Sequence, residues 1–253
     1  MLNQTIETIL AHRSVRKFTE QKLSDEQIET IVSCAQAAST SSFIQAYTII
    51  GVIDEDKKKA LAELAGPQEY VANNGYFLVF CADLHRHEVL GHMEQADIQD
   101  SLESTEKFMV SLVDTALAAQ NAAIAAESMG LGICYIGGLR NNLTQVKEIL
   151  QTPERVIPLF GMAIGYPAQE TGKKPRLPLK AVFYENSYPD DGDIQKGLEE
   201  YNQTILNYYE ERTKGKRSET WTSQMANMLS KSNRAYNRMY MKEFVQKQGF
   251  NLK

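Results

Sequence analysis

The sequence predicts an α+β protein, in which a few apolar strands lie among a larger number of helices. Residues 108–129 have the length of one long helix, about 33 Å at 1.5 Å per residue. Their apolar side chains cover almost the whole circumference, as in a helix enclosed by protein. Short apolar runs at 47–54, 76–83, 131–136 and 156–166 are typical of buried strands. The run at 76–83 is apolar throughout, which predicts a central position in the sheet.

Composition predicts one soluble globular domain with an extension, because the chain has 253 residues, of which 43% are hydrophobic and 23% charged. The amino terminus has no basic region followed by an apolar core, so no secretion signal is expected. The widely spaced Cys34, Cys81 and Cys134 lie in apolar surroundings, which predicts reduced thiols in the cytoplasm.

Two further classes of protein are not favoured. Polar residues interrupt the long apolar helix and argue against a membrane span, namely Asp114, Gln120, Asn121 and Glu127. His85, His87 and His92 lie in a polar stretch that predicts a solvated helix, and no metal-ligand spacing is present. We therefore expect neither a membrane partner nor a bound metal.

Charge is distributed unevenly along the chain. Residues 212–253 contain ten Lys or Arg and two Glu, which gives this tail a net charge of +8. The preceding 211 residues carry a net charge of −13, and the whole chain carries −5. Such a contrast predicts an anionic partner near the tail. Nucleic acid, an acidic face of the same protein and a phosphorylated small molecule all fit this charge.

A short amphipathic helix containing Ile6, Ile9 and Leu10 opens the chain and leads into a basic turn. The turn carries His12, Arg13, Ser14 and Arg16. Guanidinium forks and a hydroxyl match phosphate oxygens, so these residues fit a phosphate-binding turn. They also fit a solvated basic turn, and spacing alone does not choose.

Residues 24–27 form a capping box, which predicts a helix that begins there. A polar turn with Ser39, Ser41 and Ser42 follows, then Phe43 and Gln45. Clustered hydroxyl groups between a helix and a strand are typical of an ordinary loop. They could also form hydrogen bonds to a polar ligand.

The middle of the chain predicts a helix at 55–65 that stops at Gly66, a connector with Gln68 and Tyr70, and an exposed polar insertion at 85–101. Gly130 stops the long helix. The strand after it delivers Gly137 and Gly138 to its carboxyl end, where backbone commonly holds a ligand.

The last part of the chain predicts a helix at 144–150 and an extended basic loop at 172–178, held open by two prolines. Two or three helices follow from about Asp190, with a basic loop at 212–217 and Trp221 as an anchor.

Several catalytic signatures are absent from the sequence. The glycines at 130, 132 and 137 lack the dinucleotide-binding spacing and follow a helix, which reverses the order that this motif requires. Neither a P-loop nor a G-x-S-x-G turn occurs. Any difficult chemistry is therefore expected to belong to a bound organic cofactor.

The chain closely resembles the FMN-dependent nitroreductase superfamily, and within it the bacterial oxygen-insensitive NADPH nitroreductase and flavin reductase group. The resemblance rests on five motifs in register: HRSVRKF at 12–18, STSSFIQAYTIIGV at 39–52, AAESMGLGICYIGGLRN at 125–141, KKPRLP at 173–178 and ERTKGKRSETW at 211–221. It implies a three-layer fold with a mixed central sheet flanked by helices, in an intertwined homodimer. It also implies an FMN-binding core at 1–189 and a helical extension at 190–253.

The resemblance implies one tightly bound FMN per subunit. Its expected ligands are, in chain order, His12, Arg13, Ser14 and Arg16 at the phosphate, ribityl chain and pyrimidine edge; Ser39, Ser41, Ser42, Phe43 and Gln45, partly from the partner subunit; Gln68 and Tyr70; Ile136, Gly137, Gly138 and Leu139, with the Gly137 N–H donating towards flavin N5; and Lys174 and Arg176. Arg212, Lys214, Lys216 and Arg217 would face NADPH.

The implied activity is two-electron reduction of nitroaromatics, free flavin or quinones by NADPH in a ping-pong sequence, with no protein acid, base or nucleophile. A flavin-binding redox sensor without turnover is one alternative. A nucleic-acid-binding protein that uses the basic tail is another, although a base-stacking platform is not evident.

Overall fold

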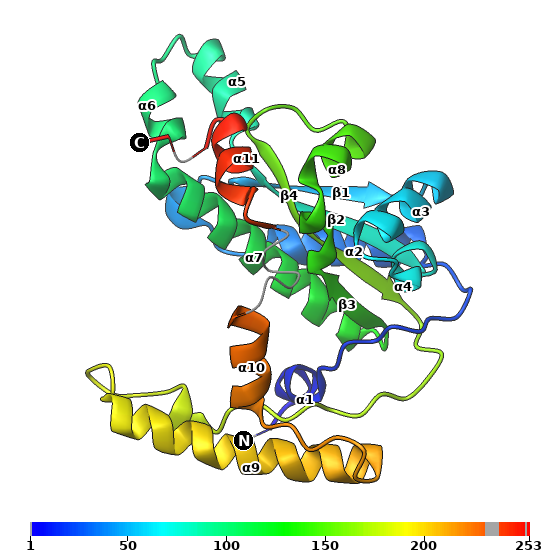
Figure 1. The fold of residues 1–253 in the computed structure, drawn as a ribbon. Helices are drawn as coiled ribbons and strands as arrows, with labels where there is room; N and C mark the ends of the chain where they lie inside the picture. The colour runs from blue at the N-terminus through cyan, green and yellow to red at the C-terminus, as the bar shows by residue number, and fades with distance from the viewer. Residues whose placement is uncertain (1, 231–237, 251) are drawn as a thin grey trace. The chain divides into compact units, whose positions relative to one another are not determined.

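The computed structural model describes residues 2–230, 238–250 and 252–253, and it contains one four-stranded sheet in the order β1-β2-β4-β3 (Figure 1). The strands are β1 (Tyr47–Val52), β2 (Tyr76–Asp83), β3 (Gly132–Ile136) and β4 (Val156–Gly165). All three strand pairs are antiparallel. The parallel character expected of a mixed sheet is limited, within the described residues of one chain, to an isolated bridge between Ser14 and Ile133. The central position predicted for β2 is confirmed.

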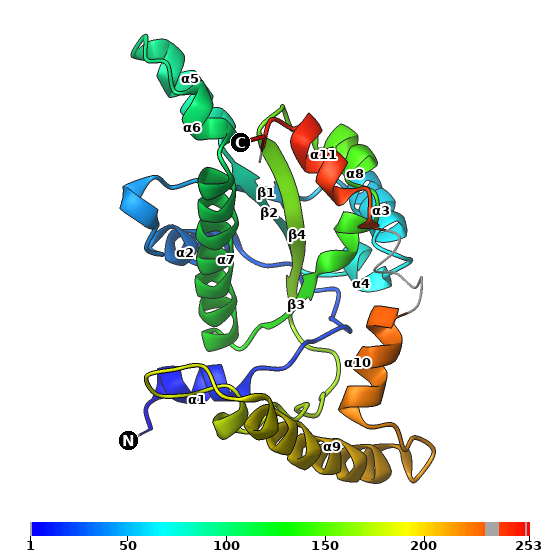
Figure 2. The same cartoon turned by 60° about the vertical axis from the view of Figure 1, so that its left-hand side comes forward.

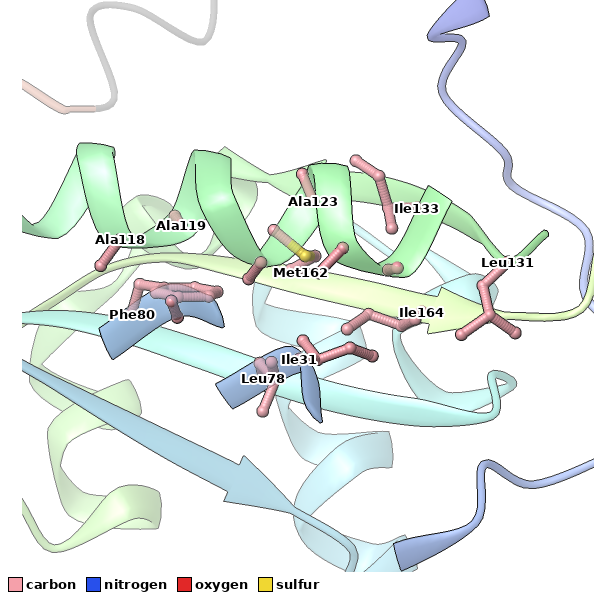
Figure 3. Packing of buried hydrophobic residues seen from close by; sticks show 14 of the residues in the cluster. Ile31, Leu78, Phe80, Ala118, Ala119, Ala123, Leu131, Ile133, Met162 and Ile164 are labelled. Atoms are coloured by element: carbon pink, nitrogen blue, oxygen red, sulfur yellow. The ribbon is translucent and has the colours of Figure 1, made fainter. Parts of the chain in front are cut away.

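One face of the sheet is covered by the long helix α7 (Thr105–Ser128) and by α2 (Asp25–Gln36) (Figure 2). Side chains alternate along β2 and β4, so Leu78, Phe80, Met162 and Ile164 face these helices (Figure 3). They pack against small side chains of α7, including Ala118, Ala119, Ala122 and Ala123. The alanines let α7 lie close to the sheet, as the sequence predicts.

The opposite face of the sheet is covered by α3 (Glu55–Leu64), α4 (Glu69–Ala72) and α8 (Leu143–Leu150). Phe77, Val79 and Ala163, which alternate with the residues above, form this second core with Leu61 and Val146. The predicted α+β class with three layers is confirmed.

Local signals place the helix ends where the sequence predicts them. Ser24 and Gln27 form both hydrogen bonds of the predicted capping box at the start of α2. Gly130 has φ 77° and ends the turn after α7. Asp54 caps α3, and Asn142 caps α8.

By length and composition alone, α7 could cross a membrane. Half of its most apolar part is buried inside the protein, and the core helix of a soluble protein can have the same length and composition. The prediction that protein encloses α7 on all sides is wrong for one chain, because Met109, Val113 and Leu117 are exposed. These three residues, four apart, define the α7 stripe.

The polar insertion folds as α5 (His85–Met93) and α6 (Gln99–Glu103). The prediction of a solvated helix is wrong for His87, which is buried and lies with Nε2 2.7 Å from the carbonyl oxygen of Ile44. The carboxyl-terminal helix α11 (Met241–Lys247) packs in a third core cluster with Leu84 and Phe250. This cluster joins the end of the chain to the sheet unit.

Residues 173–239 form a second compact unit, and residues 1–172 and 240–253 form the first. The second unit contains the short η3 (Leu179–Ala181), α9 (Asp191–Thr213) and α10 (Trp221–Ser230). Its core is formed by Tyr201, Ile205 and Tyr209 of α9, with Trp221 packed against Tyr201 as the predicted anchor. The boundary expected after residue 189 falls inside this unit, just before α9.

Candidate active site

The basic turn lies directly after α1 (Gln4–Ala11) and is held at two points. His12 Nδ1 lies 2.7 Å from Glu127 Oε1, near the end of α7. The backbone N–H of Val15 donates to the Ile133 carbonyl at 2.9 Å, beside the parallel bridge at Ser14. Arg13 remains exposed, so a fixed backbone presents its guanidinium group to solvent.

Ser14 and Arg16 lie beside the thiol of Cys134 on β3. Burial raises the pKa of this thiol, while the charge of Arg16 and hydrogen bonds from Ser14 and Arg16 oppose the rise. The net effect keeps Cys134 protonated, and all three cysteines are free. Cys134 is therefore not activated as a nucleophile.

The serine loop, residues 39–46, includes the short helix η1 (Ser41–Phe43) and is strained. Ser42, Phe43 and Gln45 all have positive φ, at 48°, 59° and 53°. Non-glycine residues in this region cost about 1–3 kcal/mol each and cluster at functional sites. Phe43 is 82% exposed, so the strained loop holds a large apolar side chain in solvent.

A fully buried carboxylate fixes the serine loop. Asp114 of α7 accepts hydrogen bonds from the backbone N–H of Ser41 at 3.1 Å and of Ala46 at 3.0 Å. From the sequence alone, Asp114 is only a polar interruption of a long apolar helix. A carboxylate between apolar residues of a helix expected to be enclosed by protein was the signal that could have identified it, because buried charges need partners.

The polar insertion supports the same loop from its other end. Arg86 Nη2 donates to Thr48 Oγ1 at 2.9 Å, and Nη1 donates to the carbonyl oxygens of Gln45 and Tyr47 at 3.4 and 3.3 Å. His87 donates to Ile44 through Nε2, as described above. The insertion at 85–101 therefore stabilises the serine loop.

Gln68 and Tyr70 lie next to the glycine turn. The Tyr70 hydroxyl donates to Gln68 Oε1, and Gln68 Nε2 donates to the Ala65 carbonyl at 2.5 Å. A Cβ atom on Gly138 would lie 2.3 Å from that same carbonyl oxygen and 2.7 Å from Gln68 Nε2. The structure therefore brings these predicted site residues together.

The contact at Gly138 gives a reason for glycine there besides the flavin that the family resemblance places against this turn. The backbone of Ala65 already excludes a side chain there, so a larger residue must displace the Ala65–Gln68 segment. In the same turn, η2 (Gly137–Asn141), Leu139 is fully buried, as is Ile136 before it, so their side chains belong to the core.

The serine loop and the basic turn are held at different places along α7. Asp114 holds the serine loop, and Glu127, thirteen residues later, holds the basic turn. This spacing corresponds to about 20 Å along the helix axis. Within one chain, therefore, the structure does not bring these two sets of predicted flavin contacts together.

Lys174 and Arg176 belong to the second unit and lie in the extended segment predicted at 172–178. Both are exposed, and Arg176 Nη1 donates to the Lys174 carbonyl at 3.0 Å. The buried Tyr201 anchors this segment through a hydrogen bond to the Pro175 carbonyl at 2.9 Å. The assignment of the two cations to the flavin stays a prediction.

The basic loop at 212–217 follows α9 in the same unit. Arg217 stacks over the Tyr209 ring at 4.1 Å and pairs with Glu219 at 3.1 Å. Arg212 donates to the Tyr208 hydroxyl. Lys214 and Lys216 are exposed and form no ion pair within the described part of the chain. Arg217 therefore holds the loop, whereas the lysines leave their charges open to solvent.

No group of three or more His, Cys, Asp or Glu side chains that could hold a metal ion occurs among the described residues.

Comparison with known proteins identifies the family. The family model described as "Nitroreductase family" matches residues 9–166, and that described as "Nitroreductase family, C-terminal domain" matches residues 174–253. The FMN reductase (NADPH) of Bacillus subtilis strain 168 is 56% identical over 251 residues, which cover 99% of each chain.

Solved structures agree with this comparison. NfrA1 of B. megaterium is 61% identical with a TM-score of 0.95, covering 98% of this chain and 100% of that one. The NADPH:FMN oxidoreductase of Vibrio harveyi, solved with NAD⁺, is 41% identical with a TM-score of 0.86, covering 99% and 100%. Both the sequence motifs and the three-layer fold are thereby accounted for, and the chain belongs to the nitroreductase family.

Proposed function

We propose that this chain is an FMN-containing, NADPH-dependent oxidoreductase that reduces free flavin, nitroaromatic compounds or quinones. Membership of the nitroreductase family supports the proposal, as do the names of the relatives, an FMN reductase (NADPH) and an NADPH:FMN oxidoreductase. We also propose a cytoplasmic location, which the three free cysteines favour.

The residues of the first unit fit FMN. Arg13 extends from a turn that Glu127 and Ile133 hold in place, and a guanidinium fork matches phosphate oxygens. Together with His12, Ser14 and Arg16 it would bind the phosphate and ribityl end. Gln68 and Tyr70 would bind the polar edge of the ring system, and the backbone from Ile136 to Leu139 would pass its reactive edge. Bound FMN would supply the two-electron chemistry that protein side chains lack.

The protein's own contribution to turnover is positioning and charge. The fixed backbone at Gly137 would direct its N–H towards flavin N5, and preorganised donors of this kind need no rearrangement during reaction. Cations near the flavin favour its reduced, anionic form.

We propose a homodimer in which the serine loop reaches the partner's flavin. About 20 Å along α7 separate Asp114, near the middle of the helix, from Glu127 at its end. This distance favours contributions from two subunits, because one flavin would otherwise have to contact both the serine loop and the basic turn of the same chain. The exposed α7 stripe and Phe43 supply the apolar surface that such an interface needs.

We propose that the basic loop selects NADPH over NADH, because only NADPH carries a 2′-phosphate. Lys214 and Lys216 are exposed and form no ion pair in the described part of the chain, so their charges are available to a phosphate. Arg212 adds a third positive charge. Arg217 would act mainly by holding the loop in shape.

The observation that carries the proposal is the exposed Arg13 on a basic turn that is pinned to both β3 and α7. The visible spectrum of the purified protein, taken before and after anaerobic addition of NADPH, tests it. A flavin band that bleaches within the dead time of mixing supports the oxidoreductase. A flavin band that bleaches only over hours would favour the redox sensor, and a colourless protein that FMN does not reconstitute would exclude both.

A further inference from the structure

A polar cavity of about 470 Å³ lies in the first unit, and none of its lining residues is assigned to the flavin. It is bounded by residues 18–22, by the start of α3 and by the end of α4, two helices that lie side by side (Figure 1). Its charged lining consists of Lys22, Lys58 and Lys59 with Glu20 and Glu55. A cavity of this volume accommodates a small metabolite.

Lys58 is the unusual member of this lining, because it is only 4% exposed. Among the described residues its ammonium group reaches one acceptor, Asn74 Oδ1 at 3.4 Å, and no carboxylate oxygen within 4.0 Å. Lysine is almost never fully buried without a partner, since burying an uncompensated charge is costly. Among the described residues, this buried ammonium group therefore has no ion-pair partner, and it lies beside an open cavity.

A second lysine converges on the same asparagine. Lys22 Nζ donates to the Asn74 backbone carbonyl at 3.2 Å. The Asn74 side-chain amide nitrogen donates to the carbonyl oxygens of Tyr70 at 3.0 Å and Val71 at 2.9 Å. Asn74 Oδ1 is consequently fixed towards Lys58. Burial lowers the pKa of Lys58, and the charge of Lys22 lowers it further, while Glu55 opposes the shift.

The remaining charged residues of the lining form no ion pair with Lys22 or Lys58 in the described part of the chain. Lys59 is exposed and pairs with Asp56 at 3.6 Å, so its charge is already matched. Glu20 and Glu55 are exposed, and neither forms an ion pair with Lys22 or Lys58 in the described part of the chain. The unmatched positive charge is located at Lys22 and Lys58.

We propose that this cavity binds a small phosphate oxyanion between Lys22 and Lys58, either inorganic phosphate or the phosphate group of a metabolite. The anion would accept hydrogen bonds from both ammonium groups and give Lys58 the ion-pair partner that it lacks among the described residues. This site is separate from the proposed flavin site and does not depend on the proposed activity.

Calorimetric titration of the full-length, FMN-loaded protein tests the proposal, with inorganic phosphate added at constant ionic strength and chloride as the comparison ion. Flavin absorbance is followed in parallel, so that phosphate entering the flavin site would be recognised by release of FMN. We expect saturable binding without flavin release. Lys58→Met should weaken it at least about tenfold, because a charge-assisted hydrogen bond is lost. The matched control Lys57→Met, at an exposed lysine of α3 outside the cavity lining, should bind as the wild type does.

Lys22→Ala removes an exposed side chain and tests the site even if Lys58→Met does not fold; we expect binding weakened about threefold. A parallel titration with glycerol 3-phosphate identifies the source of the phosphate group. Tighter binding of the ester indicates a metabolite, and tighter binding of inorganic phosphate indicates the free ion. Absence of saturable binding to the wild type, or equal affinities in the wild type and in both Lys58→Met and Lys22→Ala, would overturn the proposal.

Discussion

Asp114 accepts a hydrogen bond from the backbone N–H of Ser41 at 3.1 Å, although the two residues are 73 positions apart in the sequence. This hydrogen bond joins a fully buried carboxylate of the central helix to a loop with three non-glycine residues of positive φ. Replacing Asp114 by Asn keeps the shape but turns one acceptor into a donor that faces a backbone N–H. We expect Asp114→Asn to lower the free energy of unfolding by about 2–3 kcal/mol in urea titrations. We also expect weaker FMN binding, because the serine loop relaxes.

Asp56→Asn is the control for Asp114→Asn, because Asp56 is exposed on α3. Its unfolding free energy should change by no more than about 0.5 kcal/mol. Wild-type stability and flavin content in Asp114→Asn would show that the carboxylate does not hold the loop.

Arg13→Ala tests the phosphate-binding turn. One charge-assisted hydrogen bond to phosphate is worth about 1.5–3 kcal/mol, so FMN affinity should fall about tenfold or more. Lys17→Ala, an exposed basic residue of the same segment, is the matched control and should retain FMN. Flavin content after dialysis and fluorescence titration measure the effect. Stoichiometric FMN with unchanged affinity in Arg13→Ala would place the phosphate elsewhere.

Gly138 and Gly137 provide a matched pair in one turn. We expect Gly138→Ala to lower the unfolding free energy by about 1–3 kcal/mol, because its Cβ would lie 2.3 Å from the Ala65 carbonyl oxygen. At Gly137 the nearest atom is the end of the Arg140 side chain at 3.1 Å, so Gly137→Ala should be tolerated better. Urea unfolding of both variants measures the difference. Equal stabilities would contradict the packing argument.

The basic loop predicts the coenzyme preference. Replacing Arg212 and Arg217 together by Ala should raise the KM for NADPH at least about tenfold and leave NADH nearly unaffected. Because Arg217 also stacks on Tyr209, its loss can loosen the loop, so Lys214→Ala with Lys216→Ala is the sharper variant. It should raise the KM for NADPH alone and weaken the salt dependence of turnover. An equal rise of the KM for NADPH and for NADH would mean that the loop does not bind the 2′-phosphate.

The α7 stripe predicts the dimer. A charge at Val113 would be buried without a partner if this face meets a second subunit. Val113→Asp should therefore yield monomers in analytical ultracentrifugation and lower FMN occupancy. Ile53→Asp, at another exposed apolar position, should leave the assembly unchanged. A dimeric Val113→Asp with full FMN would locate the interface elsewhere.

The sequence alone predicted the features that depend on neighbouring residues, namely helix ends and the apolar strands. The capping box at Ser24 and the stop at Gly130 involve neighbours within a few residues, and strand β2 was apolar throughout. The basic turn, as a candidate phosphate site, and the family motifs were equally visible, because they depend on residue type and order.

Only the tertiary structure decided which residues these local features meet. Asp114 and His87 looked like a polar interruption and a solvated histidine until folding brought them to Ser41 and Ile44. Likewise, the Gly138 requirement comes from the Ala65 carbonyl on another element. Each case depends on a hydrogen bond or steric contact between segments distant in the sequence, and such contacts are set by how helices and strands pack.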